Sequence, residues 1–273
     1  MASRPKFTAR RILAAAMASC AAAAAIVLIA APQEFEGRDV LWRIVNEECV
    51  PNQLQKQDPK PCALVDLHGG VDKGFAIFKD IRGDEQFLLI PTARIPGIES
   101  PVILAPDAPN YFADAWDARS YLDELVHQTL PRDDIGLAIN SAAGRSQDQM
   151  HIHVDCVKPD VHDALQREAP SLGSQWTPVG VAFSGHHYEA MWVSGERLGA
   201  NNPFKLLANG IPGAAGDMGD RTLVVIGATR ANGDAGFILL EDAANPQIND
   251  RASGEELLDH ACGIASAAPP RQN

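Results

Sequence analysis

Two histidines separated by a single residue are the part of this sequence best suited to chemistry. Residues 149–154 read QMHIHV, so polar and apolar side chains alternate. Because successive side chains of a β-strand point to opposite faces, a strand here would turn Gln149, His151 and His153 to one face and three apolar side chains to the core. The pattern predicts a polar site rich in hydrogen-bond donors on that face.

Two kinds of chemistry could use the histidine pair, and an exposed face with no chemical role is the third interpretation. His151 and His153 could supply two zinc ligands, but a third ligand would have to come from elsewhere. The candidates for that third ligand stand at no diagnostic spacing; they are His68, His127, His162, His186 and His187. Alternatively, one neutral imidazole is a nucleophile that attacks phosphorus.

A polar loop just before the pair favours phosphate chemistry. It contains Gly144, Arg145 and Ser146, and its backbone N–H groups can bind phosphate without a broad positive field. The chain carries a net charge of −12, and residues 1–11 hold four of its 23 basic residues and none of its 35 acids. The remainder therefore sets 19 bases against 35 acids. An acidic domain repels phosphate backbones, which argues against non-specific nucleic-acid binding.

Short strands and helices are expected around the pair. Apolar residues at helical spacing predict helices over residues 40–48 and 109–128. Apolar runs at 74–79 and 86–91 flank Arg82-Gly83-Asp84 and predict a β-hairpin. Strands are expected over 135–140 and 149–157, and the polar loop 144–148 lies between them.

The second half of the sequence repeats part of this order. We expect a short helix over 203–208, a hairpin formed by 221–229 and 236–241, and a final helix that begins at Ser253. In that helix Ser253 would be the N-cap and Glu256 its capping-box partner. Helix, hairpin and helix thus occur twice, which suggests an internal duplication. The antiparallel hairpins make α+β the expected fold class, and residues 265–273 are expected to form a frayed tail.

An uncharged segment, residues 12–31, follows the basic N-terminus. As a helix it would span roughly 30 Å, the thickness of a bilayer core. The positive-inside rule then places residues 1–11 in the cytoplasm and the chain after Pro32 outside. A cleaved signal peptide is the alternative, and a loose lipobox that ends at Cys20 allows lipid attachment. The sequence thus divides into a cytoplasmic N-terminus (1–11), an anchor or signal segment (12–31) and an extracytoplasmic domain (32–273).

Cysteine usage agrees with export. Four cysteines follow Cys20, and an even count in an oxidising compartment suggests two disulfides. Three pairings are possible. Cys49 and Cys62 flank a polar loop that contains proline and are expected to close it, which leaves Cys156 for Cys262. Four buried free thiols are the alternative. The sequence has no Cys-x-x-Cys motif, so a zinc ribbon or thioredoxin-type site is unsupported.

The order of these motifs resembles the histidine-triad (HIT) superfamily. Strands at 75–81 and 87–91 are followed by Asn140, by Gly144-x-Ser146 and by two histidines on a strand. The superfamily has an antiparallel sheet with flanking helices, and its usual motif holds three histidines. The resemblance implies that His151 attacks the α-phosphorus of a nucleotide and that His153 is the third histidine of the motif.

Other site residues carry over from the same resemblance. Gln149 stands where the first histidine of the motif would be, a departure that spares the nucleophile. Asp80 matches the acid that binds ribose hydroxyls. Asn140, Gly144 and Ser146 match positions that orient the nucleophile or hold phosphate oxygens. No metal or other cofactor is implied.

Longer runs of sequence resemble bacterial CDP-diacylglycerol pyrophosphatases. These runs include Pro51-Asn52-Gln53, Ile90-Pro91-Thr92-x-Arg94-Ile95, Gly97-x-Glu99-Ser100-Pro101, Leu137-Ala138-Ile139-Asn140-Ser141 and Ile152-His153-Val154-x-Cys156. The resemblance implies hydrolysis of CDP-diacylglycerol to CMP and phosphatidate at the bacterial inner membrane, with the catalytic domain in the periplasm and the N-terminal segment as anchor. Arg94 is a candidate phosphate contact, and His186 could reach the site.

The sequence is also compatible with functions other than hydrolysis of CDP-diacylglycerol. The same site could pass CMP to an acceptor other than water, or His151 and His153 could serve a metal-dependent phosphohydrolase. A non-catalytic ectodomain that binds a lipid or a nucleotide is a third class. Acyl-chain preference and oligomeric state are not encoded in any motif that we recognise.

Overall fold

The computed structural model describes Met1 and residues 37–81 and 85–267. The expected membrane segment 12–31, the lipobox cysteine and the hairpin turn at 82–84 lie outside the described residues. Within those residues, no helix combines the length and apolar character needed to cross a membrane.

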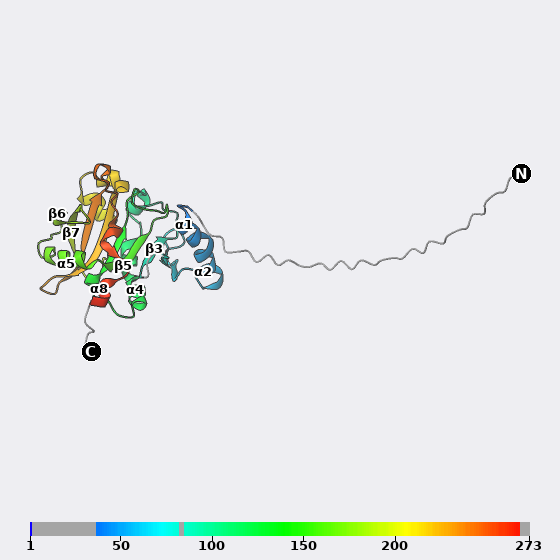
Figure 1. The fold of residues 1–273 in the computed structure, drawn as a ribbon, viewed down its shortest axis with the longest axis horizontal. Helices are drawn as coiled ribbons and strands as arrows, with labels where there is room; N and C mark the ends of the chain where they lie inside the picture. The colour runs from blue at the N-terminus through cyan, green and yellow to red at the C-terminus, as the bar shows by residue number, and fades with distance from the viewer. Residues whose placement is uncertain (2–36, 82–84, 268–273) are drawn as a thin grey trace. The chain divides into compact units, whose positions relative to one another are not determined.

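A ten-stranded antiparallel sheet organises the domain, and it confirms the α+β class (Figure 1). The order along the sheet is β1-β2-β3-β5-β4-β8-β9-β7-β6, and β10 pairs with the end of β5 beyond β3. The strands are β1 (Leu64–Asp66), β2 (Phe75–Lys79), β3 (Phe87–Pro91), β4 (Ile135–Ile139), β5 (Ile152–Val157), β6 (Thr177–Phe183), β7 (His186–Ser194), β8 (Arg221–Thr229), β9 (Ala235–Ala243) and β10 (Leu258–Asp259). The predicted hairpins 74–91 and 221–241 are both present.

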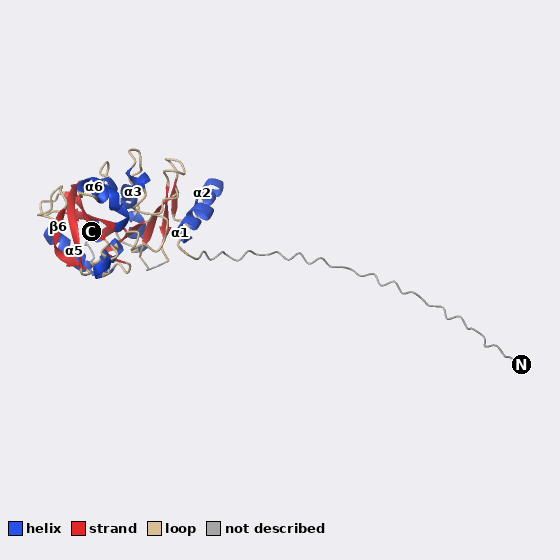
Figure 2. Ribbon diagram, turned by 90° about the horizontal axis from the view of Figure 1, so that it is seen from above, coloured by secondary structure: helices blue, strands red, loops and turns tan. Residues whose placement is uncertain are grey.

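Short helices cover both faces of this sheet. They are α1 (Val40–Arg43), α2 (Val50–Lys56), α3 (Tyr111–Asp117), α4 (Arg119–Leu125), α5 (Pro159–Glu168), α6 (Pro203–Gly210), α7 (Ala214–Asp217) and α8 (Gly263–Ala267). One face packs against α3, α4 and α6 around Trp116, Phe112 and Phe204, and Figure 2 shows α3 and α6 beside one another.

The opposite face carries two separate apolar clusters. Over β2 and β3, the N-terminal helical segment packs Leu41 and Val45 against Phe78 and Leu88. Over β4, β8 and β9, α5 and residues 257–258 cover a second cluster. These two clusters leave a gap on the sheet where β5 begins, and this gap holds the histidine pair.

The N-terminal helix is longer than predicted because it accommodates a proline. A π-helical turn, Ile44–Cys49, links α1 to α2, and Pro51 follows at the second position of α2. Proline donates no N–H, and its ring collides with the carbonyl four residues earlier in a regular helix. The wider π turn relieves this conflict, so the helix runs on to Lys56 instead of ending near residue 48.

The final helix predicted from Ser253 is not present. Residues Gly254–Leu257 form a single 3-10 turn, and Ser253 makes no side-chain cap. Ser253 Oγ donates to Asn140 Oδ1, while Glu256 binds His186. The polar groups that would cap a helix are thus used in long-range contacts. Of the expected tail 265–273, residues 265–267 belong to α8, and the others lie outside the described residues.

The sheet does repeat, but with a different correspondence from the one predicted. The order β2-β3-β5-β4 in the first half recurs as β6-β7-β9-β8 in the second, and the halves meet where β4 pairs with β8. The hairpin 221–241 therefore corresponds to β4 and β5, not to the hairpin 74–91. In β9, the strand equivalent to β5, Ile238 and Leu240 lie in the second cluster on the histidine face, so the second half carries no histidine pair there.

Both predicted disulfides are present. Cys49 bonds to Cys62 and ties the N-terminal helix to the chain that enters β1. Cys156 bonds to Cys262 and ties β5 to the C-terminal segment across 106 residues.

Candidate active site

The sheet face that carries the histidine pair is mostly apolar, and His153 of β5 is a polar residue between apolar neighbours on β3 and β4. Across the sheet, His153 pairs with Leu88 of β3 on one side and with Ala138 of β4 on the other. Met150, Ile152 and Val154 point into the core on the opposite face, as the alternation predicted. A cavity of about 360 Å³ opens over the imidazoles. Its walls are formed by Val40, Leu41, Ile44, Phe78, Asp80, Ile81, Leu88, Asn140, Gly144, Ser146, Gln147, His151, His153 and Glu255, together with Gly37.

His151 is a buried imidazole held in one tautomer. Its Nδ1 lies 2.8 Å from the carbonyl oxygen of Gln149. A carbonyl only accepts hydrogen bonds, so Nδ1 carries the proton and Nε2 keeps its lone pair. Burial lowers the pKa of His151 from its ordinary value, which keeps the ring neutral. His151 is therefore a neutral base or nucleophile at the wall of the cavity.

His153 has the opposite tautomer. Its Nδ1 lies 2.6 Å from Gln86 Nε2, an amide that can only donate, so the proton belongs on Nε2. That nitrogen lies 3.5 Å from Glu255 Oε2. The same Gln86 amide lies 3.3 Å from Asp80 Oδ2 at the end of β2. Gln86 thus connects His153 to the acid predicted to bind ribose.

A chain of polar contacts leads from the cavity into the sheet. Asn140 Nδ2 donates to Glu255 Oε2 at 2.9 Å. Glu255 Oε1 lies 3.3 Å from His260 Nε2, and His260 Nδ1 lies 2.5 Å from Asp155 Oδ2. Asp155 is completely buried. Each carboxylate in this chain therefore has an imidazole beside it.

In this series of polar contacts, His260 and Glu255 each stabilise the charged form of the other. The carboxylates of Asp155 and Glu255 raise the pKa of His260 to about 10, so it is a cation at neutral pH. Burial opposes ionisation of Glu255, but His260, His153 and Asn140 outweigh it and hold its pKa well below the usual range. Burial raises the pKa of Asp155 to about 6, against the effect of its bond to His260. At pH 7 the cavity wall thus carries an anionic Glu255 backed by cationic His260.

A glycine lets the C-terminal segment, residues 250–262, reach this site. A Cβ at Gly254 would lie 2.4 Å from Val224 Cγ2 and 2.6 Å from Thr222 Oγ1 of β8, a separation that side chains do not adopt. The Gly254 N–H donates to Thr222 Oγ1 at 2.8 Å. The segment therefore lies directly on the sheet, and the next residue, Glu255, enters the cavity.

The loop 141–146 forms the opposite wall. Ser141 Oγ accepts from the backbone N–H groups of Ala143 and Gly144 and donates to the carbonyl of Arg251. Gly144 and Ser146 line the cavity, as predicted. Arg145 does not: it forms a two-fold hydrogen bond to Glu99 and also binds Asp148. Arg145 therefore fixes the loop.

Two predicted site residues lie outside the cavity wall. Gln149 is fully buried, and its amide donates both hydrogens, to the carbonyls of Pro91 and Ala93. No amide hydrogen remains for a phosphoryl oxygen, so Gln149 acts on His151 through its backbone carbonyl. Arg94 pairs with Asp39 and lies over the Trp42 ring, so the expected phosphate contact is not formed at this position.

Among the residues that the structure describes, no third histidine lines the cavity. None of the five candidates for a third zinc ligand is there, and His186 instead lies beside Glu256 and Asp250. Glu255, Gln86 and His260 were not predicted as site residues. A local signal existed only for Glu255, and it was interpreted as the first turn of a helix.

The fold and the site together describe an α+β protein whose cavity, on one face of an antiparallel sheet, is lined by a pair of histidines. The family model for CDP-diacylglycerol pyrophosphatase matches residues 36–266, and the chain belongs to this family. It is similar to a CDP-diacylglycerol pyrophosphatase of Yersinia pestis, with 42% identity over 235 residues that cover 86% of this chain and 88% of that protein. The predicted resemblance to CDP-diacylglycerol pyrophosphatases is confirmed.

Proposed function

We propose that the protein hydrolyses CDP-diacylglycerol to CMP and phosphatidate through a nucleotidyl intermediate on His151. In the first step, His151 Nε2 forms a bond to the CMP phosphorus, and the bond from that phosphorus to the bridging oxygen breaks. Phosphatidate leaves with the electron pair. In the second step, water attacks the same phosphorus, loses a proton and releases CMP from the imidazole. Two easier displacements thus replace one difficult displacement.

The tautomer of His151 is the observation that carries this proposal. Its Nδ1 proton is committed to the Gln149 carbonyl, so the lone pair on Nε2 is available at the cavity. As phosphorus binds to Nε2, positive charge develops on the ring, and the hydrogen bond from Nδ1 strengthens. Burial keeps the ring unprotonated before the attack.

Neighbouring groups supply the remaining functions. His153 Nε2–H faces the cavity beside Glu255 and can donate to charge that develops on a phosphoryl oxygen. Asp80 lines the same cavity and contacts the same Gln86 amide nitrogen as His153, a position suited to ribose hydroxyls. Apolar side chains of the N-terminal helical segment and of Phe78 offer a surface for the base.

The substrate places the enzyme at a lipid surface. The family is named for a lipid-linked nucleotide, and an uncharged segment precedes the domain in the sequence. We propose that residues 12–31 anchor the protein in the bacterial inner membrane, with residues 32–273 in the periplasm. A reporter fused after residue 36 and tested for protease protection in spheroplasts checks this topology; protection from external protease would contradict it.

A trapping experiment tests the covalent step. The enzyme is mixed with CDP-diacylglycerol labelled in the CMP phosphate, quenched in alkali within milliseconds to seconds, and digested. Phosphoramidates survive alkali and break in acid, so label should remain on the peptide that contains His151 at high pH and leave at low pH. The His151→Ala variant should carry no label and should lose at least ~10³-fold in kcat. His162→Gln is the matched control.

The outcomes separate the alternatives. Label on His151 together with CMP transferred to an added alcohol would assign a transferase. A different result would be that no label is trapped, that ¹⁸O from water enters the product directly, and that turnover needs an added metal. These results together would replace the covalent mechanism by a metal-dependent one.

A further inference from the structure

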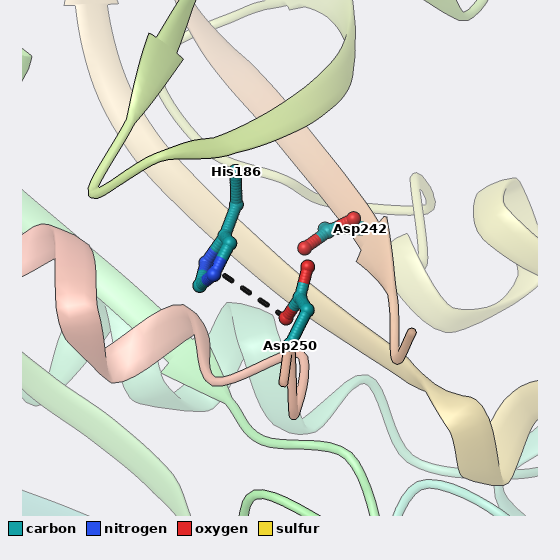
Figure 3. A group of neighbouring side chains, drawn as sticks. All are labelled: His186, Asp242 and Asp250. Carbon is teal, nitrogen blue, oxygen red and sulfur yellow. Dashed lines mark ion pairs between the residues drawn. The ribbon is translucent and has the colours of Figure 1, made fainter. Parts of the chain in front are cut away.

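A second polar cluster lies on the other side of the C-terminal segment from the active site. It consists of His186 at the start of β7, Asp242 near the end of β9, and Asp250 (Figure 3). One potential ligand atom from each residue lies within 4.8 Å of the others. None of the three residues lines the active-site cavity.

Local backbone structure brings these residues together. Asp242 pairs with Thr222 across the β8–β9 ladder, and the chain then turns back through a bridge between Asn245 and Asp250. Asp250 thereby returns to the side of Asp242. The hairpin of β6 and β7 brings His186 over them, with Nδ1 3.8 Å from Asp250 Oδ1.

The two carboxylates are buried with unequal hydrogen bonding. Asp250 Oδ1 accepts from the backbone N–H of Ala252, and Asp242 Oδ1 accepts from that of Ala243. Asp242 Oδ2 has no hydrogen-bond partner, although Asp242 is only 9% exposed. Figure 3 shows this carboxylate directed at Asp250. Two buried carboxylates that face one another repel unless a cation or a proton lies between them.

We propose that His186, Asp242 and Asp250 bind a divalent transition-metal cation at a site separate from the active site. One imidazole nitrogen and two carboxylate oxygens suit Zn²⁺ or Mn²⁺ better than Mg²⁺ or Ca²⁺, which prefer oxygen ligands alone. The unpartnered Asp242 oxygen gains a ligand bond, and the repulsion between the carboxylates is relieved.

Such a cation would hold the segment that completes the active site. Asp250 begins this segment, and Glu255 and Glu256 follow within it. Glu256 already accepts a hydrogen bond from Tyr188 OH at 2.8 Å. It also accepts one from His186 Nδ1 at 2.8 Å, so a cation bound at Nδ1 would take the place of that proton. The cation therefore adds a second attachment of residues 250–256 to β7 and β9, and its role is structural rather than catalytic.

Metal binding is measured on the full domain after dialysis against a chelator. Calorimetric titration with Zn²⁺ and with Mn²⁺ should show one site, and each metal should raise Tm. Asp242→Asn and His186→Gln should weaken binding by about 10–100-fold or more. His162→Gln is the control, since His162 lies beside two acids, Asp134 and Asp163, outside the cluster. An anomalous-scattering peak among the three side chains would locate the metal.

Three results would overturn the proposal. The first is no stoichiometric binding of either metal by the wild-type domain. The second is unchanged binding in both cluster variants, and the third is loss of binding in His151→Ala, which would place the metal on the active-site pair. If Asp242→Asn raises Tm while the wild type binds no metal, a shared proton lies between the carboxylates instead. Alkali-stable label on His151 should persist after chelation, so this test stands apart from that of the covalent mechanism.

Discussion

Asn140 and Glu255 lie 115 residues apart in the sequence, yet the Asn140 amide donates to the Glu255 carboxylate at 2.9 Å. Asn140 Oδ1 also accepts from the Glu255 backbone N–H at 3.2 Å. This reciprocal pair joins the end of β4 to the C-terminal segment. It also fixes an anion beside His153, so that ring is oriented from both sides, at Nδ1 by Gln86 and at Nε2 by Glu255.

Replacement of this carboxylate should reduce catalysis without unfolding the domain. Glu255→Gln keeps the size of the side chain but removes the charge that orients His153 and pairs with His260. A hydrogen bond to a charged group contributes roughly 1.5–3 kcal/mol, so we expect kcat/KM to fall by about 10–150-fold. Glu124→Gln, at an exposed position on α4, is the control. Equal kcat/KM in wild type and Glu255→Gln would remove Glu255 from the site.

Substitution of Asp80 should weaken use of the nucleotide more than it affects folding. Asp80 follows β2 at the cavity wall, and Asp80→Ala removes the proposed acceptor for ribose hydroxyls. The same range of energies predicts a loss of about 10–150-fold in kcat/KM with CDP-diacylglycerol. A substrate that lacks ribose hydroxyls should lose much less. If both substrates are affected equally, Asp80 does not bind ribose.

The dependence of rate on pH should reflect a neutral His151. Burial lowers the pKa of this ring, and only the unprotonated form can attack phosphorus. Activity is therefore present above the lowered pKa and is lost as pH falls through it. We expect the acidic limb of kcat/KM to have its midpoint below ~6.5, the ordinary value for histidine. A midpoint above that value in steady-state assays would contradict the assignment.

His260 should make stability fall in alkali. Its pKa is raised to about 10 by Asp155 and Glu255, so its contribution is complete below the unfolded value of ~6.5 and is lost as pH rises toward 10. Solvent screening reduces the effect, because about a third of the side chain is exposed. Urea unfolding at pH 6.5, 8 and 9.5 should show this decline in wild type and a flatter profile in His260→Gln. Parallel profiles would show that His260 is not a cation in the folded domain.

The two disulfides should contribute unequally. Cys156–Cys262 spans 106 residues and Cys49–Cys62 spans 13, and a longer closed loop removes more entropy from the unfolded chain. Each double Cys→Ser variant should lose ~2–5 kcal/mol of unfolding free energy, with the larger loss for the long loop. That variant should also lose activity, since the bond holds the C-terminal segment. Peptide mapping without reduction checks the pairing in wild type, and four alkylatable thiols in folded protein would refute it.

Periodicity predicted several elements whose burial differs between faces or is nearly complete, but it missed β7 and α5. The alternation around His151 located β5, and the apolar runs located β2, β3 and β8. β6 was not predicted because it is an edge strand with a bulge, and most of its side chains are exposed. The repeat was assigned to the wrong hairpins because hydropathy does not encode the order of strands in a sheet.

The site was predictable where the family resemblance supplied a matching position in the sequence. Asp80, Asn140 and Ser146 line the cavity, as the family resemblance implied. Glu255 and His260 lie on the C-terminal segment, which reaches the site through a close approach at Gly254 and is tied to β5 by a disulfide. The pattern around Glu255 indicated a helix, and no pattern indicated His260. Gln149 shows the opposite error: its polarity indicated a donor to substrate, but its amide satisfies two backbone carbonyls.

The C-terminal segment has a consequence for biosynthesis. The ribosome synthesises both histidines more than a hundred residues before Glu255. The hydrogen bond between Asn140 and Glu255 can therefore form only after that later residue has been added. A chain truncated after β9 would contain both histidines and every strand of the sheet except β10. It would lack the Glu255 carboxylate and Cys262, the disulfide partner of Cys156. If catalysis requires Glu255, competence arises only after the C-terminal segment has been synthesised, and a chain that terminates before it lacks both Glu255 and Cys262.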